Sequence, residues 1–212
     1  MNKTYIIKKI SCSTLSSDDP IWRYIEKAEL DCYDFSEIKD YPKTSARIVY
    51  SDEGFTVLFE TNERSKDVLA RYHKLNDPSY TDSCMEFFFN PCPQKGKRYM
   101  NLELGAGGAL LIQTGTSRYD RVFVNTTLEQ FKIEIKISDG GWTARIFIPY
   151  NFILSQFEEV SNEFSGNLQK CGDDTVCPHY PVWNKIVSPQ PDFHTPGSFG
   201  RFILDGNVNI IK

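Results

Sequence analysis

The sequence predicts an all-β protein, an antiparallel β-sandwich or jelly roll with one short helix, that forms a single domain over residues 1–212. Three observations favour this fold. Apolar and polar residues alternate with period two in several short segments, which is typical of strands with one buried face. Gly, Pro, Asn and Asp recur between these segments, as expected for turns. The aromatic content of 14% suits pleated surfaces.

The most regular pattern is a β-hairpin over residues 131–149. In residues 131–137 apolar side chains alternate with charged ones, so one face is predicted to be buried and the other exposed. An Asp-Gly-Gly turn at residues 139–141 precedes a second alternating run, which Pro149 ends. The residues predicted to contribute to the core, from this hairpin and an earlier one, are Phe131, Ile133, Ile135, Trp142, Ala144, Ile146, Phe55, Val57 and Phe59.

The earlier hairpin is predicted where Ala46–Tyr50 and Phe55–Glu60 flank a polar turn at residues 51–54. Further strands are predicted at Cys84–Asn90, Arg98–Leu104, Ala109–Thr114 and Phe199–Leu204. Apolar residues recur at helical spacing between Asn151 and Val160, which predicts the helix. Five prolines lie in residues 178–197, so this stretch is expected to run as a long extended loop.

Composition and charge argue against several functional classes. The net charge is −4 and the basic residues are scattered, so the sequence lacks the basic stripe expected for nucleic-acid binding. No apolar stretch approaches the roughly 20 residues that span a bilayer. The first ten residues contain no signal-peptide core, which predicts a cytoplasmic protein as given, or an exported one if a signal peptide precedes this sequence. In the cytoplasm its six cysteines are expected to be reduced.

Few residue patterns in the chain match known catalytic or cofactor motifs. The glycines of residues 105–110 precede a strand-like run and not a helix, so they indicate a turn and not a dinucleotide-binding loop. Cys171, Cys177 and His179 lie close in sequence, but their spacing fits no familiar zinc pattern. None of the three histidines accompanies a nucleophile signature.

Carboxylates in predicted strands provide the alternative that the protein is an enzyme. Asp82 and Glu86 are separated by four residues of extended chain, about 13 Å, which exceeds the spacing that glycoside hydrolysis requires. Glu86 and Glu103 could instead meet across neighbouring strands. A small glycoside hydrolase that uses this pair is therefore the alternative to a binding protein.

Two aromatic residues lie outside the alternating segments. Tyr80 precedes a predicted strand and Trp183 lies in the proline-rich loop, both among polar or proline residues. An exposed aromatic ring can cover the C–H face of a pyranose, while nearby carboxylate, amide and guanidinium groups bond its hydroxyls. The chain therefore carries a candidate sugar-binding constellation.

In order along the chain, several segments share the pattern of one known family. They are Asp-Pro-Ile-Trp at 19–22, residues 80–88, residues 99–103, residues 142–149, residues 166–173, Trp183, and residues 193–200. With these segments the chain resembles the family 9 carbohydrate-binding modules, and more broadly the DOMON-like sandwiches, from about Asp19 to Leu204.

The resemblance implies a non-catalytic domain that binds carbohydrate in an aromatic cleft, at the ends of glycan chains. Tyr80, Glu86 and Trp183 occupy the positions of the family's sugar-binding residues, although the better-studied modules carry a tryptophan where this chain has Tyr80. The smaller ring offers less stacking area. Members of the family can bind structural calcium, but no acidic loop here forms a recognisable cage.

The resulting site prediction is specific. Tyr80 and Trp183 should face each other across a solvent-open cleft with Glu86 at its floor. Arg98, Asn101 and Asn184 are predicted to be further contacts at its rim. Two alternatives remain open. In one, Trp183 is a plug that seals one end of the sandwich and Glu86 is a buried partner for Arg98. In the other, the protein is a haem-binding DOMON-like module with Met85, Met100 or a histidine as axial ligand.

Overall fold

The computed structural model describes residues 2–12, 15–32, 41–206 and 210–211. Its strands are β1 (Thr4–Lys9), β2 (Ala28–Glu29), β3 (Thr44–Tyr50), β4 (Gly54–Thr61), β5 (Cys84–Asn90), β6 (Tyr99–Gly105), β7 (Leu110–Gly115), β8 (Val122–Phe123), β9 (Glu134–Ser138), β10 (Gly141–Pro149), β11 (Glu159–Val160), β12 (Glu163–Cys171), β13 (Gly200–Leu204) and β14 (Ile210–Ile211). Its helices are α1 (Tyr150–Gln156) and the 3-10 turns η1 (Pro20–Tyr24), η2 (Ser79–Thr81), η3 (Pro93–Lys95), η4 (Glu129–Phe131) and η5 (Pro196–Ser198). None of these helices is long and apolar enough to cross a membrane.

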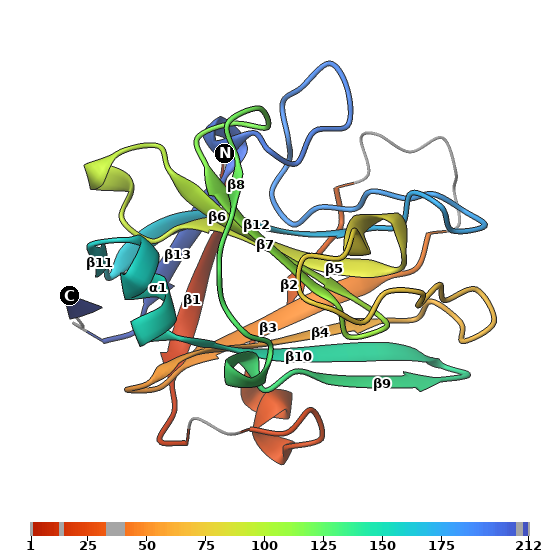
Figure 1. Cartoon of the computed structure of the whole chain (residues 1–212). Coiled ribbons are helices and arrows are strands. Elements are labelled where there is room, and N and C mark those ends of the chain that lie inside the picture. The colour runs from red at the N-terminus through yellow and green to blue at the C-terminus, as the bar shows by residue number, and fades with distance from the viewer. Residues whose placement is uncertain (1, 13–14, 33–40, 207–209, 212) are drawn as a thin grey trace.

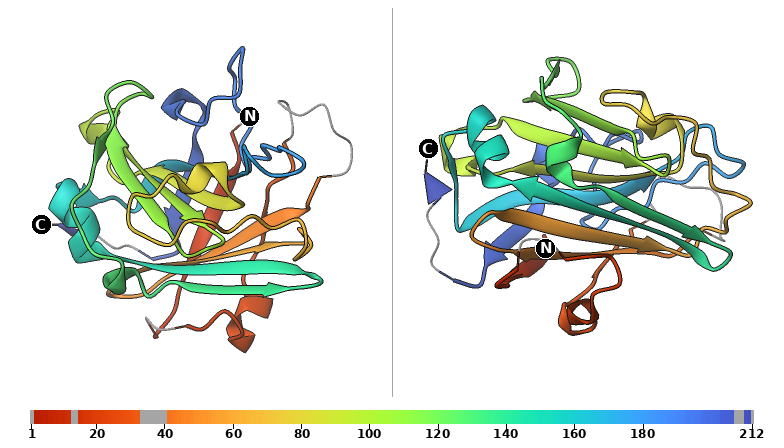
Figure 2. Two further views of the ribbon diagram at one scale, coloured as in Figure 1. Left: turned by 45° about the vertical axis from the view of Figure 1, so that its right-hand side comes forward. Right: turned by 60° about the horizontal axis from the view of Figure 1, so that its bottom comes forward.

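Twelve of the strands form a curled sheet that packs on itself as a sandwich, which confirms the predicted fold class (Figures 1 and 2), and β11 and β14 form a separate two-stranded sheet. The strand order is β8-β7-β6-β5-β12-β13-β1-β3-β4-β10-β9, with β2 paired to β3. We call the strands from β8 to β13 in this order the upper layer, and those from β3 to β9 the lower layer. The helix α1 lies at one end of the sandwich (Figure 1).

The strand β1 departs from the predicted antiparallel pairing. Residues Thr4–Ile7 pair in parallel with Arg201–Leu204 of β13, and Lys8–Lys9 pair in parallel with Val49–Tyr50 of β3. One short strand thus contributes to both layers and connects them. The sheet is therefore mixed at β1 and antiparallel at the other pairings between the strands named above.

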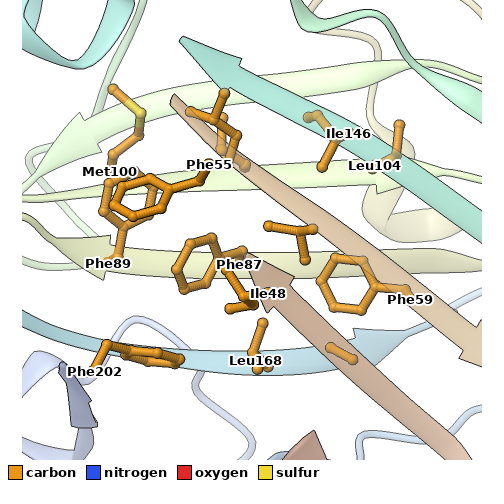
Figure 3. Close-up of a cluster of buried hydrophobic side chains, with 14 of the residues drawn as sticks. Ile48, Phe55, Phe59, Phe87, Phe89, Met100, Leu104, Ile146, Leu168 and Phe202 are labelled. Carbon is orange, nitrogen blue, oxygen red and sulfur yellow. The ribbon is translucent and has the colours of Figure 1, made fainter. Parts of the chain in front are cut away.

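The core lies between the two layers, where apolar side chains of both point toward one another (Figure 3). All nine residues predicted for the core contribute to it. Seven are buried, while Ile133 and Ile135 are partly buried and pack against the same cluster. The period-two pattern therefore identified the inward faces of both hairpins correctly.

The first strand of the second hairpin is shorter than the pattern predicts. Phe131 lies in η4, and Lys132 follows it with a left-handed φ of 45°, so pairing begins only at Glu134. As the last strand in the sheet, β9 is also partly solvated, and Ile137 is 44% exposed. Phe131 therefore reaches the core from η4 and not from β9.

The predicted helix from Asn151 to Val160 is also too long. The helix α1 ends at Gln156, because Phe157 adopts an extended conformation. Val160 then pairs with Ile210 between β11 and β14. The loop predicted over residues 178–197 is confirmed as far as Thr195, because that stretch contains no helix or strand apart from isolated bridges at Val182, and η5 begins at Pro196.

A buried ionic cluster joins the two layers inside the sandwich. Lys170 of β12 is completely buried, and its Nζ lies 2.9 Å from Oε2 of Glu63 and 2.6 Å from Nε2 of His179. The same Glu63 oxygen accepts a hydrogen bond of 2.8 Å from the indole of Trp142, and its other oxygen accepts one from Ser83. Each charge in the cluster is therefore matched by hydrogen bonds from both layers.

His179 should make the stability of the protein depend on pH. Burial and, secondarily, the charge of Lys170 lower the pKa of His179 from 6.5 to about 4. Between these two values the unfolded chain binds a proton that the folded chain does not, so this contribution to stability is complete above about pH 6.5 and falls as the pH falls toward 4. The difference corresponds to about 3 kcal/mol.

Urea unfolding of the wild type and of His179→Gln at pH 7 and pH 4.5 measures this effect. The variant should lose less free energy of unfolding between the two pH values than the wild type does. His73 is exposed, so His73→Gln is the matched control and should retain the wild-type difference. Equal pH dependence in all three proteins would contradict the prediction.

Candidate functional site

The outer face of the upper layer carries polar residues beneath a cover of loops. Along β5 and β6, alternate side chains point into the core, and the others, including Glu86 and Glu103, point outward. Glu86 lies directly opposite Glu103 on one side and Gln169 of β12 on the other. The covering loops leave a pocket of about 490 Å³ over this row.

The pocket combines acidic, basic, amide and aromatic side chains. Its lining residues are Asn76, Pro78, Tyr80, Glu86, Glu103, Leu111, Gln113, Arg118, Arg121, Phe123, Cys171, Asp173, Tyr180, Pro191, Phe193 and His194. The floor comes from β5, β6, β7 and β12, and the walls come from the loops before β5, after β7 and after β12. Segments far apart in the sequence thus enclose one volume on several sides.

Glu86 and Glu103 form a buried carboxyl pair in the floor, with only 2% and 3% of their surfaces exposed. Burial and then the neighbouring Glu103 raise the pKa of Glu86 well above its usual range. Burial also raises the pKa of Glu103 to about 7, although Arg121 and a hydrogen bond from Asn101 oppose the rise. Near neutral pH the pair can therefore both donate and accept hydrogen bonds.

Two arginines bring positive charge to the pocket. Arg121 donates to Oε1 of Gln113 at 2.6 Å and to the carbonyl of Arg118. Arg118 forms an ion pair of 3.0 Å with Asp192. These partners belong to the pocket lining or lie next to it, and they hold both guanidinium groups in place. The guanidinium groups can donate hydrogen bonds to the oxygen atoms of a ligand.

Aromatic rings form much of the pocket wall. Tyr80 is 42% exposed and Phe123 is 59% exposed, although large aromatic side chains are usually buried. Tyr180 and Phe193 contact each other edge-to-face, with ring centroids 6.3 Å apart. The pocket therefore offers apolar ring surface beside charged hydrogen-bonding groups.

The structure corrects the predicted position of Trp183. Tyr80 and Glu86 line the pocket, but Trp183 is only 4% exposed and does not. Its ring lies in the core, 6.4 Å from that of Tyr5 and 4.9 Å from that of Phe202. The interpretation of Trp183 as a plug in the sandwich agrees with this placement, and the predicted cleft between Tyr80 and Trp183 does not.

The three residues predicted for the rim also lie elsewhere. Arg98 donates to the hydroxyl of Thr114 and to the carbonyl of Gln156. Asn184 is buried, where its side chain bonds the backbone of Lys3 and Ser198. Asn101 is also buried and donates to Glu103 at 2.8 Å from the neighbouring outward position of β6. Of the three, Asn101 alone touches a residue that lines the pocket.

The alternatives to a binding protein find little support in this geometry. Glu86 and Glu103 project from neighbouring strands of one sheet, so they would approach a sugar from the same side, whereas glycosidase carboxyls flank the scissile bond. Asp82 is buried in an ion pair with Arg71. Of the axial ligands expected for haem, Met85 and Met100 lie in the hydrophobic core and do not line the pocket. His194 does line it, but its Nδ1 lies within hydrogen-bonding distance of the Tyr99 hydroxyl, at 2.9 Å.

A comparison with models of protein families matched residues 21–204 to carbohydrate-binding family 9. The chain belongs to this family. Among solved structures, a candidate carbohydrate-binding protein from Bacteroides uniformis has 24% identity and a TM-score of 0.81, with 97% of this chain and 100% of that chain covered. A comparison with curated proteins found no match.

Two further solved structures are of a family 9 module from Caldicellulosiruptor kristjanssonii. The complex with glucose has 14% identity and a TM-score of 0.67, with 97% of each chain covered. The complex with cellotriose has 14% identity and a TM-score of 0.66, with 97% of this chain and 95% of that chain covered. At these identities the likeness establishes a shared fold.

Several pocket residues of this family 9 chain escaped the sequence analysis. Gln113 is the clearest, because it lies in a predicted strand two residues after Leu111 and alternates with the apolar Ile112, which indicates an outward position. Arg118, Arg121 and Phe123 follow that strand in a segment without a pattern. Tyr180 lies in the same proline-rich loop as Trp183, where no strand alternation indicates which aromatic ring is exposed.

Proposed function

We propose that the pocket on the outer face of the upper layer binds carbohydrate without cleaving it. The observation that carries this proposal is the combination of exposed rings with a buried carboxyl pair in one volume of about 490 Å³. The volume falls in the usual range for small-ligand sites. Rings can cover the C–H faces of a sugar, and the polar groups can bond its hydroxyls.

The pair of Glu86 and Glu103 suits hydroxyl groups, which both donate and accept. With raised pKa values, the pair can offer an acceptor oxygen and a donor O–H to adjacent hydroxyls of one sugar ring. Arg118 and Arg121 add donors to the same pocket. The spacing of these groups would discriminate between epimeric sugars. An epimer with one hydroxyl in a different position would leave a buried polar group of the pocket without a hydrogen-bond partner.

The enclosure of the pocket supports a terminal sugar as ligand. Loops before β5, after β7 and after β12 all contribute to its walls. A glycan interior would need a groove open at both ends, whereas a walled pocket fits the last residue of a chain. The glucose and cellotriose complexes of family 9 relatives make these two sugars the first probes to test.

Tyr80→Ala should weaken binding of cellotriose at least tenfold, or about 1.4 kcal/mol, because the wall loses a partly exposed ring. Isothermal titration calorimetry measures the change once a glycan array has confirmed a ligand. Tyr24 is 86% exposed and lies in η1, outside the pocket lining, so Tyr24→Ala is the matched control and should bind like the wild type.

Two results would contradict the proposal. One is a folded Tyr80→Ala protein that binds every glycan ligand of the wild type with unchanged affinity. The other is release of reducing sugar from a bound glycan, which would support the hydrolase alternative. A Glu103→Gln variant would then show whether the carboxyl pair is responsible, because the glutamine side chain cannot transfer the proton.

A further inference from the structure

Four outward-facing positions on β5 and β12 form a compact cluster next to the pocket floor. Cys84 lies opposite Cys171, and Glu86 lies opposite Gln169, in alternate pairs of the same antiparallel ladder. Residues two apart on a strand point to the same face, so all four side chains share one side of the sheet. Because the ladder fixes their positions, this arrangement does not depend on flexible loops.

Three of these side chains come close enough to share one ion. The two Sγ atoms and a carboxylate oxygen of Glu86 all lie within 4.8 Å of one another. The closest contact joins Sγ of Cys171 to Oε1 of Glu86 at 2.7 Å. In a tetrahedral zinc site, sulfur and oxygen ligands lie roughly 3.5–3.8 Å apart, so shifts of about 1 Å would bring these atoms into coordination.

The fourth side chain, Gln169, independently indicates that a ligand belongs here. It is completely buried, yet neither its amide nitrogen nor its amide oxygen has a hydrogen-bond partner. A buried unpaired amide is costly, and it commonly marks a site that an ion or water completes. Its position opposite Glu86 directs it to the face that carries the cluster.

The charge of the floor points to the same conclusion. Glu86 and Glu103 are buried, and within the described residues neither forms a salt bridge. Burying carboxylate charge without a close cation is unfavourable. A divalent cation held by Glu86 would offset that cost directly.

We infer that Cys84, Cys171 and Glu86 bind a thiophilic divalent cation, Zn²⁺, at the floor of the pocket. Two thiolates and one carboxylate are ligands that zinc accepts, whereas calcium takes oxygen ligands only, so this cluster does not fit the structural calcium that members of the family can bind. Binding would release to solvent the two thiol protons, together with the proton of Glu86 whenever that carboxyl is protonated. Cys171 and Glu86 line the pocket, so a water from it can fill the fourth position beside Gln169.

Cobalt(II) provides a direct spectroscopic test, because bonds between thiolate and Co²⁺ give a near-ultraviolet charge-transfer absorption. Reduced, metal-stripped protein should bind one Co²⁺ per chain with the intensity of two thiolates, and Zn²⁺ should displace it. Cys84→Ser and Cys171→Ser should each lose about half or more of this absorption. Cys12 is exposed and lies far in the sequence from Cys84 and Cys171. Cys12→Ser is therefore the control, and its charge-transfer absorption should match that of the wild type.

Glu86→Gln keeps both thiols and should weaken Zn²⁺ binding at least tenfold. This variant tests the site even if one of the serine variants fails to fold. A wild-type protein with reduced thiols and no charge-transfer absorption would overturn the inference, as would full absorption in both folded serine variants. These measurements use no sugar, so their failure would leave the proposed carbohydrate binding intact, and failure of sugar binding would not affect them.

Discussion

Trp183→Ala is expected to lower the free energy of unfolding by about 3–5 kcal/mol, while the affinity for cellotriose stays within about twofold of the wild type. The ring contacts Tyr5 and Phe202 in the core, so its removal leaves a large cavity. The edge of the Trp183 ring also lies close to Gly200: a Cβ atom on residue 200 would be 2.5 Å from the ring. The sandwich is therefore closely fitted around this side chain.

Urea unfolding and calorimetry on the same preparations separate stability from binding. Tyr80→Ala serves as the reciprocal control, because it should weaken binding and leave the free energy of unfolding nearly unchanged. A Trp183→Ala protein that keeps its stability and loses its sugar affinity would contradict the core placement. That result would favour the cleft between Tyr80 and Trp183 that the sequence predicts.

Trp183 shows why the candidate site could be predicted only in part. The proline-rich loop around it lacks strand alternation, which correctly predicted its extended path but suggested that its aromatic residues are exposed. The ring is buried by Tyr5 and Phe202, which lie in β1 and β13 near the two ends of the chain. Contacts between such distant segments leave no local pattern in the sequence.

Glu86 illustrates the part of the site that sequence patterns do reach. It is a charged residue within a predicted strand that is otherwise rich in phenylalanine, so its outward direction follows from alternation with Phe87. The pairing of Glu86 with Glu103 was foreseen as one alternative. The third strand in this row, which carries Gln169, was not predicted, and the cluster with Cys84 and Cys171 therefore remained hidden.

The strand β12 was missed because polar residues occupy both of its faces. Gln169 points outward beneath the loops, and Lys170 points inward to the ionic cluster, so no apolar face repeats with period two. Gly166 interrupts the pattern further, because it has no side chain. Glycine is needed at this position, since a Cβ there would lie 2.6 Å from the carbonyl oxygen of Phe88. A central strand with these features becomes recognisable only when its neighbours are known.

Lys170→Met is expected to lower the free energy of unfolding by about 3–5 kcal/mol, because it removes the cation from a buried pair and leaves the Glu63 carboxylate without its counter-ion. The methionine side chain has a similar length and can fill much of the same space, so the effect reports charge more than volume. The ammonium group also lies 5.9 Å from the ring centroid of Trp142, a contact that the variant loses.

The double variant Lys170→Met/Glu63→Gln distinguishes the buried charge from simple loss of packing. Glutamine keeps an acceptor for the Trp142 indole and removes the uncompensated carboxylate, so the double variant should recover part of the loss that Lys170→Met causes. Arg201→Met breaks the exposed ion pair with Glu163 and is the matched control, with an expected cost below about 1 kcal/mol. Urea unfolding at pH 7 measures all four proteins.

Two outcomes would contradict the prediction. Equal losses of free energy of unfolding for Lys170→Met and Arg201→Met would show that the cluster inside the sandwich contributes no more than a surface ion pair. A double variant less stable than Lys170→Met would show that Glu63 stabilises the fold without its lysine.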